Sequence, residues 1–262
     1  MALITETSLR SRLAQGLPNP YPIAAGDLLT PAANDFLKSR GIAIQRLKAE
    51  APAASPVEPA PDAPLLPVGV SGRHVHLSPE HVEALFGEGY QLTPLKELSQ
   101  PGQFAAQETV TLIGPKGVLQ NARILGPSRG ASQVEISRTD GFALGVKPPV
   151  RLSGDLEGTP GITVAGPKGA VVLTQGLIVA KNHVHMSPDD AQRFEVSDGD
   201  RLILQTRGDR PLAFMDVVVR VNPRYALDVH LDTDEANAAQ LNTGDTVQMI
   251  GKNGVFTRGE RG

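Results

Sequence analysis

The chain has 262 residues, which is long enough for one large domain or for two of ordinary size, each with a hydrophobic core. A net charge of −3 and the absence of tryptophan argue against a basic or base-stacking surface for nucleic acid. The absence of cysteine excludes disulfides, thiolate zinc sites and a thiol nucleophile. A metal would therefore need nitrogen and oxygen ligands from the protein.

The sequence contains no apolar run near the ~20 residues of a membrane-spanning helix. Its N-terminus lacks the basic segment and apolar core of a secretory signal. We therefore expect a cytoplasmic protein that does not contact a membrane.

Residues 1–48 are expected to form a small helical N-terminal extension. Thr5 is placed to cap a first short helix. Thr30 and Pro31 supply a cap and a proline at the start of a second helix, and Gly41 is placed to end it. A unit this short buries little apolar surface, so we expect it to pack on a partner or on the rest of the chain.

Residues 49–67 contain six prolines and six alanines, a composition that predicts an extended, semi-rigid linker. After the linker the pattern is mainly β, with short helices expected at 79–86 and 188–194. Strand-like runs cover 68–70, 109–113, 134–136, 171–173 and 213–220. The two Gly-Pro-Lys-Gly segments, 114–117 and 166–169, predict hairpin turns and lack the spacing of a phosphate loop. This order favours β-barrel or sandwich units over a doubly wound α/β fold.

Two copies of a His-x-His motif stand out, His74 with His76 and His183 with His185, each followed by an apolar residue, serine and proline. In a strand, residues i and i+2 leave the same face about 6.6 Å apart, so two imidazoles can bind one metal ion. A lone motif of this kind is more often structural. Two copies with the same flanking residues, holding four of the six histidines, favour a metal site.

A second repeat supplies a third ligand for each pair. Arg129 is followed six residues later by Glu135, and Arg224 is followed six residues later by His230. The predicted sets are His74, His76 and Glu135, and then His183, His185 and His230. Three ligands leave open positions for water or substrate; zinc suits these donors, and cobalt, iron or nickel stay open. His81, which joins neither set, is expected on a surface helix.

Arg129 lies between Gly-Pro and Gly, close to one of these ligands. Two metal ions beside an arginine would form a strong site for an anion such as phosphate. The alternative is a solvated arginine in a turn. We favour the role in binding substrate.

Several stretches, in this order, resemble the phosphate propanoyltransferase (phosphotransacylase) family of bacterial microcompartments. The resemblance covers about residues 66–256. It is carried by the motifs at 70–78, 125–129, 133–137, 181–187 and 229–231. It implies exchange of a propanoyl or acetyl group between coenzyme A and inorganic phosphate, acyl-CoA + phosphate = acyl phosphate + CoA, at a two-metal site.

The resemblance also implies a fold and roles for residues. Two β-barrel domains capped by short helices are expected, one from residues 68–72 plus 181–256 and the other from 73–180. The family's two zinc ions would be held by His74, His76 and Glu135, with a position open to the coenzyme A sulfur, and by His183, His185 and His230. Arg129 matches the phosphate-binding arginine, and the coenzyme A pocket would be lined by Ser71, Lys96, Arg123 and Asn237.

Residues 1–48 resemble the start of microcompartment-associated cobalamin adenosyltransferases, in the stretches 30–33 and 39–42. This similarity suggests targeting or assembly and does not imply adenosyltransferase activity. We accordingly expect contacts with microcompartment shell or cargo proteins through residues 1–48, a location inside a bacterial microcompartment, and a homo-oligomer.

The predicted mechanism is direct transfer, in which one metal polarises the thioester carbonyl or captures the departing thiolate, and the other metal, with Arg129, orients phosphate. A serine acyl-enzyme has no nucleophile-elbow motif to support it. Two other classes stay open. A metal-dependent hydrolase of the amidohydrolase type would need an alternating β/α chain, and a non-catalytic metal-binding scaffold would bind metal without turnover.

Overall fold

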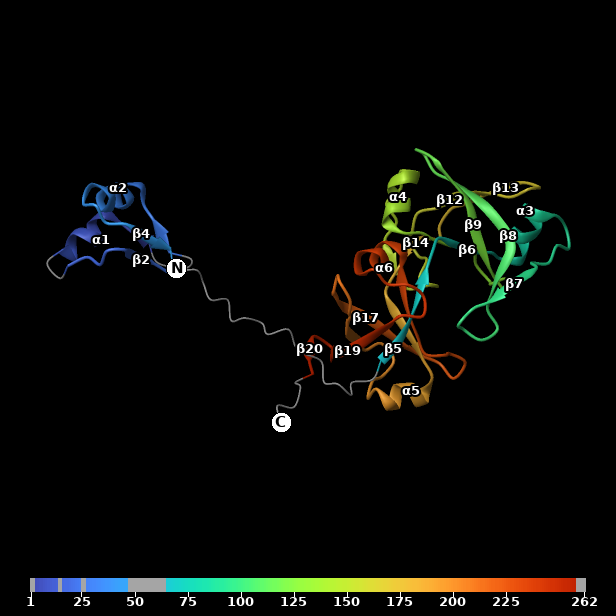
Figure 1. Ribbon diagram of the computed structural model, residues 1–262. Helices are drawn as coiled ribbons and strands as arrows, with labels where there is room; N and C mark the ends of the chain where they lie inside the picture. Colours follow the sequence, from blue (N-terminus) through green and yellow to red (C-terminus); the bar gives the residue numbers. More distant parts are fainter. Residues whose placement is uncertain (1–2, 14–15, 25–26, 47–64, 258–262) are drawn as a thin grey trace. The chain divides into compact units, whose positions relative to one another are not determined.

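The computed structural model describes residues 3–13, 16–24, 27–46 and 65–257 (Figure 1). The chain divides into two compact units, Met1–Glu58 and Pro59–Gly262. Most of the predicted linker, residues 49–64, lies outside the described residues, and residues 65–67 begin a strand. No helix among the described residues has the length and apolar character needed to cross a membrane.

The N-terminal unit contains the two predicted helices, α1 (Glu6–Ser11) and α2 (Pro31–Ser39), capped by the side chains of Thr5 and Thr30. It also contains two parallel strand pairs that the sequence pattern did not reveal, because each strand has only two or three residues. These are β1 (Leu3–Ile4) with β3 (Leu28–Leu29) and β2 (Tyr21–Ile23) with β4 (Ile44–Arg46). The unit has a small core of its own, formed by Leu9, Tyr21, Ile23, Ala33, Phe36 and Leu37.

The second unit confirms the prediction of a mainly β chain with two barrel-type parts, of which one is closed and one is a half-barrel. In the closed barrel, the strand order β16-β17-β15-β18-β5-β19 returns to β16, and β20 extends β19. The bounds are β5 (Leu65–Ser71), β15 (His183–Met186), β16 (Arg201–Gln205), β17 (Ala213–Val221), β18 (Asp228–Asp232), β19 (Thr246–Lys252) and β20 (Val255–Phe256). Short helices α5 (Pro188–Arg193) and α6 (Thr233–Ala239) accompany this barrel.

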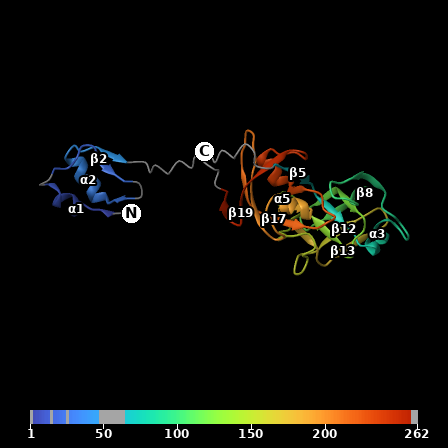
Figure 2. The same ribbon diagram turned by 90° about the horizontal axis from the view of Figure 1, so that it is seen from below.

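The half-barrel has the order β11-β14-β10-β6-β9-β8-β12-β13, with β7 paired to β8. Its strands are β6 (His74–His76), β7 (Pro94–Glu97), β8 (Phe104–Ile113), β9 (Val118–Gly126), β10 (Gln133–Glu135), β11 (Val150–Arg151), β12 (Ile162–Ala165), β13 (Ala170–Leu173) and β14 (Leu177–Ala180). Helices α3 (Pro79–Phe86) and α4 (Arg138–Leu144) belong to this part. Figures 1 and 2 show α3 beside the half-barrel and α5 beside the closed barrel.

The predicted hairpin turns are present, and each meets the C-terminus of a helix. The turn at 114–117 joins β8 to β9, and Lys116 N donates to Leu144 O at the end of α4. The turn at 166–169 joins β12 to β13, and Lys168 N donates to Leu85 O in α3. A Cβ on Gly114 would lie 2.4 Å from Leu144 O, so the close approach requires glycine.

The chain passes from one barrel to the other immediately before each His-x-His. Strand β5 of the closed barrel ends at Ser71, and β6 of the half-barrel begins at His74. Strand β14 of the half-barrel ends at Ala180, and β15 of the closed barrel begins at His183. Both pairs of histidines therefore lie where the two barrels meet.

Each strand that carries a predicted ligand ends in the same way. A ligand is followed by a buried apolar residue, then by a residue whose side chain caps a short helix. The four apolar residues are Leu77, Ile136, Met186 and Leu231, and the four caps are Ser78, Ser137, Ser187 and Asp232. Because the cap stops the strand two residues after the ligand, each ligand side chain stays at the edge of a core and next to open space.

Candidate active site

The first set lies on the paired strands β6 and β10. The antiparallel register puts Glu135 opposite His74. His74 Nε2 is 3.4 Å from Glu135 Oε2, and His76 Nε2 is 3.9 Å from Glu135 Oε1. One ligand atom from each of these three buried residues lies within 4.8 Å of the others.

The second set repeats this arrangement on β15 and β18, with His230 opposite His183. The ligand atoms of His183, His185 and His230 again lie within 4.8 Å of one another. The intervening Val75 and Val184 are fully buried in the two cores, as strand alternation predicted. The structure thus brings together both sets of residues that the sequence grouped.

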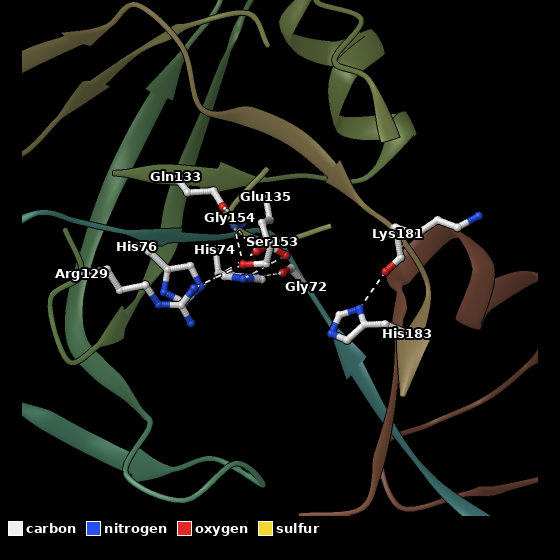
Figure 3. Close-up of polar contacts among 10 residues, drawn as sticks. All are labelled: Gly72, His74, His76, Arg129, Gln133, Glu135, Ser153, Gly154, Lys181 and His183. Carbon is white, nitrogen blue, oxygen red and sulfur yellow. Dashed lines mark hydrogen bonds and ion pairs between the residues drawn. The ribbon is translucent and has the colours of Figure 1, made fainter. Parts of the chain in front are cut away.

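Backbone carbonyls orient the first histidine of each pair. His74 Nδ1 donates to Gly72 O at 2.9 Å, and His183 Nδ1 donates to Lys181 O at 2.7 Å (Figure 3). In a neutral ring this leaves Nε2 without a proton and free to accept a metal. Two further buried nitrogens, His76 Nδ1 and His185 Nδ1, have no hydrogen-bond partner, whereas His230 Nε2 lies 3.2 Å from the carboxylate of Asp228. Buried polar atoms are normally paired, so these orphaned nitrogens fit sites that bind metal ions.

Burial keeps most of these imidazoles neutral. Burial, together with the charge of a neighbouring histidine, lowers the pKa of His76 to about 3, of His183 to about 4 and of His185 to about 2. Burial opposes ionisation of Glu135, but the charges of His74, His76 and His183 and a hydrogen bond from His74 together outweigh it and lower the pKa of this carboxyl. Neutral imidazole and ionised carboxylate are the forms that bind a metal, so the donor sets fit divalent ions such as zinc.

A cavity of about 920 Å³ opens onto both sets, and residues from both barrels line it. All six predicted ligands line this cavity, together with Arg129, Ser71, Lys96 and Arg123. Its volume is that of an ordinary small-molecule site.

Arg129 is the cation next to the first set, and Figure 3 shows its side chain beside His76. Its backbone N donates to Leu77 O, and its Nη1 donates to Ser153 Oγ at 3.2 Å. Burial lowers the pKa of Arg129, Glu135 opposes this shift, and the charge of Arg220 adds to it. The guanidinium has no carboxylate partner among the described salt bridges, so its remaining N–H groups are available to an anion.

The other predicted pocket residues differ in placement. Ser71 and Lys96 line the cavity, as does Arg123, whose Nη1 donates to Ala106 O and Gln107 O. Asn237 does not: it is exposed on α6 and is not among the residues lining the cavity. A coenzyme A contact from Asn237 stays a prediction.

Sequence reasoning missed part of the cavity wall. Arg220 on β17 lies opposite His185 in the parallel register, and the ring of Tyr225 lies 4.2 Å from that of His185. Arg224, which the repeat identified, is exposed and lines the cavity. His81 belongs to neither set, and its Nδ1 contacts Ser132 Oγ at 2.7 Å. The alternation of β17 was the one signal available for Arg220, but it does not indicate which strand lies next to β15.

Comparison with known proteins agrees with the resemblance. A family model described as phosphate propanoyltransferase matches residues 67–242. A protein of Thermotoga maritima named phosphate propanoyltransferase is 61% identical over 184 residues, which cover 70% of this chain and 88% of that protein. A protein of the same name from Listeria monocytogenes is 54% identical over 185 residues, which cover 71% of this chain and 87% of the relative.

Proposed function

The chain belongs to the phosphate propanoyltransferase family, a family of transferases, and we propose that it exchanges a propanoyl or acetyl group between coenzyme A and inorganic phosphate. The reaction is acyl-CoA + phosphate = acyl phosphate + CoA. One observation supports this most directly. Two sets of three side chains that could hold a metal ion, five of the six buried, and an arginine with no carboxylate partner among the described ion pairs open onto one cavity between two barrels.

In this proposal, His74, His76 and Glu135 hold one metal and His183, His185 and His230 hold the other, both most simply zinc. When bound, such ions supply Lewis acidity, which polarises a thioester carbonyl and favours departure of a thiolate. Strand pairing and backbone carbonyls orient these residues. Preorganisation of this kind lowers the free energy needed to assemble the site.

The chain itself supplies the groups that bind and orient the substrates. Arg129 would grip phosphate oxygens with the N–H groups that Ser153 does not use. Arg220 lines the same cavity and adds a second positive charge. Ser71, Lys96 and Arg123 line the cavity and would contact coenzyme A, whose phosphates carry negative charge. Bringing both substrates together in one cavity makes the transfer effectively intramolecular.

The alternatives predict different assay results. A full chain loaded with metal should contain two ions and release coenzyme A from propanoyl-CoA or acetyl-CoA only when phosphate is present. Removing the metal with a chelator should abolish release, and adding zinc should restore it. Release that does not depend on phosphate would support a hydrolase instead. Two bound ions without any turnover would support a scaffold. The mainly β fold lacks the alternating β/α order of an amidohydrolase.

We also propose that residues 1–48 dock the enzyme to microcompartment shell or cargo proteins in the cytoplasm, and that the enzyme is a homo-oligomer. The family match begins at residue 67, and the preceding unit has a core of its own. Both observations fit a separate module for assembly.

Deleting residues 1–48 should leave kcat and metal content close to those of the full chain, because the described residues that line the cavity all follow position 68. The deletion should change oligomer size or capture by shell proteins, measured by size-exclusion chromatography with light scattering and by co-purification. A shortened protein that folds, keeps its metal and has lost turnover would contradict this prediction.

A further inference from the structure

In each half of the site, a buried polar residue lies two positions before the third ligand. Gln133 precedes Glu135 on β10, and Asp228 precedes His230 on β18. Strand alternation puts each on the same face as the ligand that follows it. The registers are also equivalent, because Gln133 lies opposite His76 and Asp228 lies opposite His185. Gln133 is 2% exposed and Asp228 is 5% exposed, so both need a partner for their polar groups.

The amide of Gln133 is fixed at both ends (Figure 3). Its Nε2 donates to Glu135 Oε1 at 2.5 Å and to Ser153 Oγ at 2.9 Å. Its Oε1 accepts from Gly154 N at 2.8 Å. The side chain thus directs an N–H group at the carboxylate of Glu135 and leaves the other carboxylate oxygen, Oε2, beside His74.

Asp228 occupies the equivalent place in the second half but offers an acceptor. Its Oδ2 lies 3.2 Å from His230 Nε2 and accepts the hydroxyl of Ser99 at 2.5 Å. Gly69 on β5 lies opposite His230, and a Cβ at that position would lie 2.7 Å from Oδ2. The carboxylate therefore keeps its place only because residue 69 has no side chain.

We propose that Gln133 and Asp228 are equivalent positioning residues, which hold Glu135 and His230 in the orientations needed to bind metal. The chemistry of each matches its ligand: a hydrogen-bond donor holds a carboxylate, and an acceptor holds an imidazole. This inference rests on the proposed metal-dependent function. In other proteins, mutating a residue that hydrogen-bonds to a metal ligand typically lowers metal affinity about 10- to 100-fold.

The proposal also connects the two barrels. Ser99 lies in the loop between β7 and β8 of the half-barrel, yet it contacts Asp228 on β18 of the closed barrel. Gln100 in the same loop donates to Ala226 O at 3.0 Å. The orientation of His230 therefore depends on a loop from the other barrel.

The test uses full-length variants that each keep only one of the two sets of metal ligands, and cobalt(II) is the probe. His185→Ala leaves only the first set, and His76→Ala leaves only the second. Adding Gln133→Leu should weaken cobalt binding about 10- to 100-fold in the first background and leave the second unchanged. Adding Asp228→Ala should weaken cobalt binding in the second background and leave the first unchanged. Affinity is measured by competition with a chelator, and the visible spectrum of the saturated protein should shift with the changed ligand geometry.

Three variants separate positioning from general damage. Gly69→Ala and Ser99→Ala leave Asp228 in the chain but disturb its carboxylate, so both should weaken the second set alone. Asp200→Asn should change neither set, because this half-buried carboxylate accepts from Ser197 N and Asn253 Nδ2 and does not line the cavity. Asp228→Asn, which keeps an oxygen acceptor, should recover part of the loss. These smaller changes also test the idea if Asp228→Ala fails to fold in a thermal-unfolding assay.

The outcomes distinguish this inference from the proposed function. If the unmodified chain binds no cobalt or zinc, the metal-dependent function itself is wrong. If the chain binds two ions and the Gln133 and Asp228 variants keep the same affinity and cobalt spectrum, only the positioning role is wrong. Equal weakening of both sets by either variant would also overturn it, because it would indicate loss of general packing.

Discussion

His76→Ala should remove the metal of the first set and acyl transfer activity together. His76 is 3% exposed and lies with His74 and Glu135 in one buried set, which no fourth histidine, aspartate or glutamate of the described residues joins. The variant should retain one metal per chain, because the second set is intact. Metal Lewis acidity contributes several kcal/mol to such reactions, so turnover should fall by roughly 10³-fold or more. Elemental analysis and a phosphate-dependent acyl-CoA assay on the same sample measure both quantities.

His81→Ala is the matched control for this prediction. His81 lies in α3 only a few residues further along the chain, but it contacts Ser132 and belongs to neither set. The control should keep two metals and near-normal turnover. A folded His76→Ala protein with two metals and normal activity would exclude the first set from the site.

Arg129→Ala should reduce acyl transfer by about 10²-fold or more, which is the scale for losing a charged donor that stabilises a transition state. The guanidinium is half-buried beside the first set and has no carboxylate partner among the described ion pairs. Arg129→Lys should recover only part of the loss, because an ammonium cannot form the planar two-point contact with phosphate. Metal content should stay at two per chain in both variants, since arginine is not a ligand.

Steady-state kinetics with varied phosphate measure the effect of Arg129, with Arg138→Ala as the control. Arg138 is an exposed arginine on α4 and does not line the cavity. Near-normal activity in a well-folded Arg129→Ala protein would remove this residue from the phosphate site. It would also weaken the proposal of acyl transfer to phosphate.

The sequence was informative wherever the determining interactions are local. The helices after each His-x-His follow from Ser78 and Ser187, which cap them, and from the prolines that come next. Alternation along β6 and β15 placed the histidines on one face and the valines in the cores. The helices α4 and α6 were missed, although the caps Ser137 and Asp232 follow Glu135 and His230 by the same spacing. That repeated order of ligand, apolar residue and cap was readable from the sequence.

Residues far apart in the chain were harder to place. The coenzyme A contact assigned to Asn237 came from a matching position and stays a prediction, and Asn237 is exposed on α6 and is not among the residues that line the cavity. Asp228 and Ser99 are separated by 129 positions, and no local pattern connects them. Gly69, which makes room for Asp228, lies on a third segment of the chain, strand β5.

The sequence by itself determined the mainly β class, the two groups of candidate ligands and the side of each strand on which they lie, because strand alternation and helix capping act within a few residues. Only the tertiary structure decided which strands pair, that one barrel closes through β16 and β19 while the other stays half-open, and that both sets share a cavity. Alternation specifies which face of a strand is buried but leaves its partner open. That choice depends on the packing of two cores built from distant segments, and the same packing brings Gln133 and Asp228 to the ligands that they hold in the proposed site.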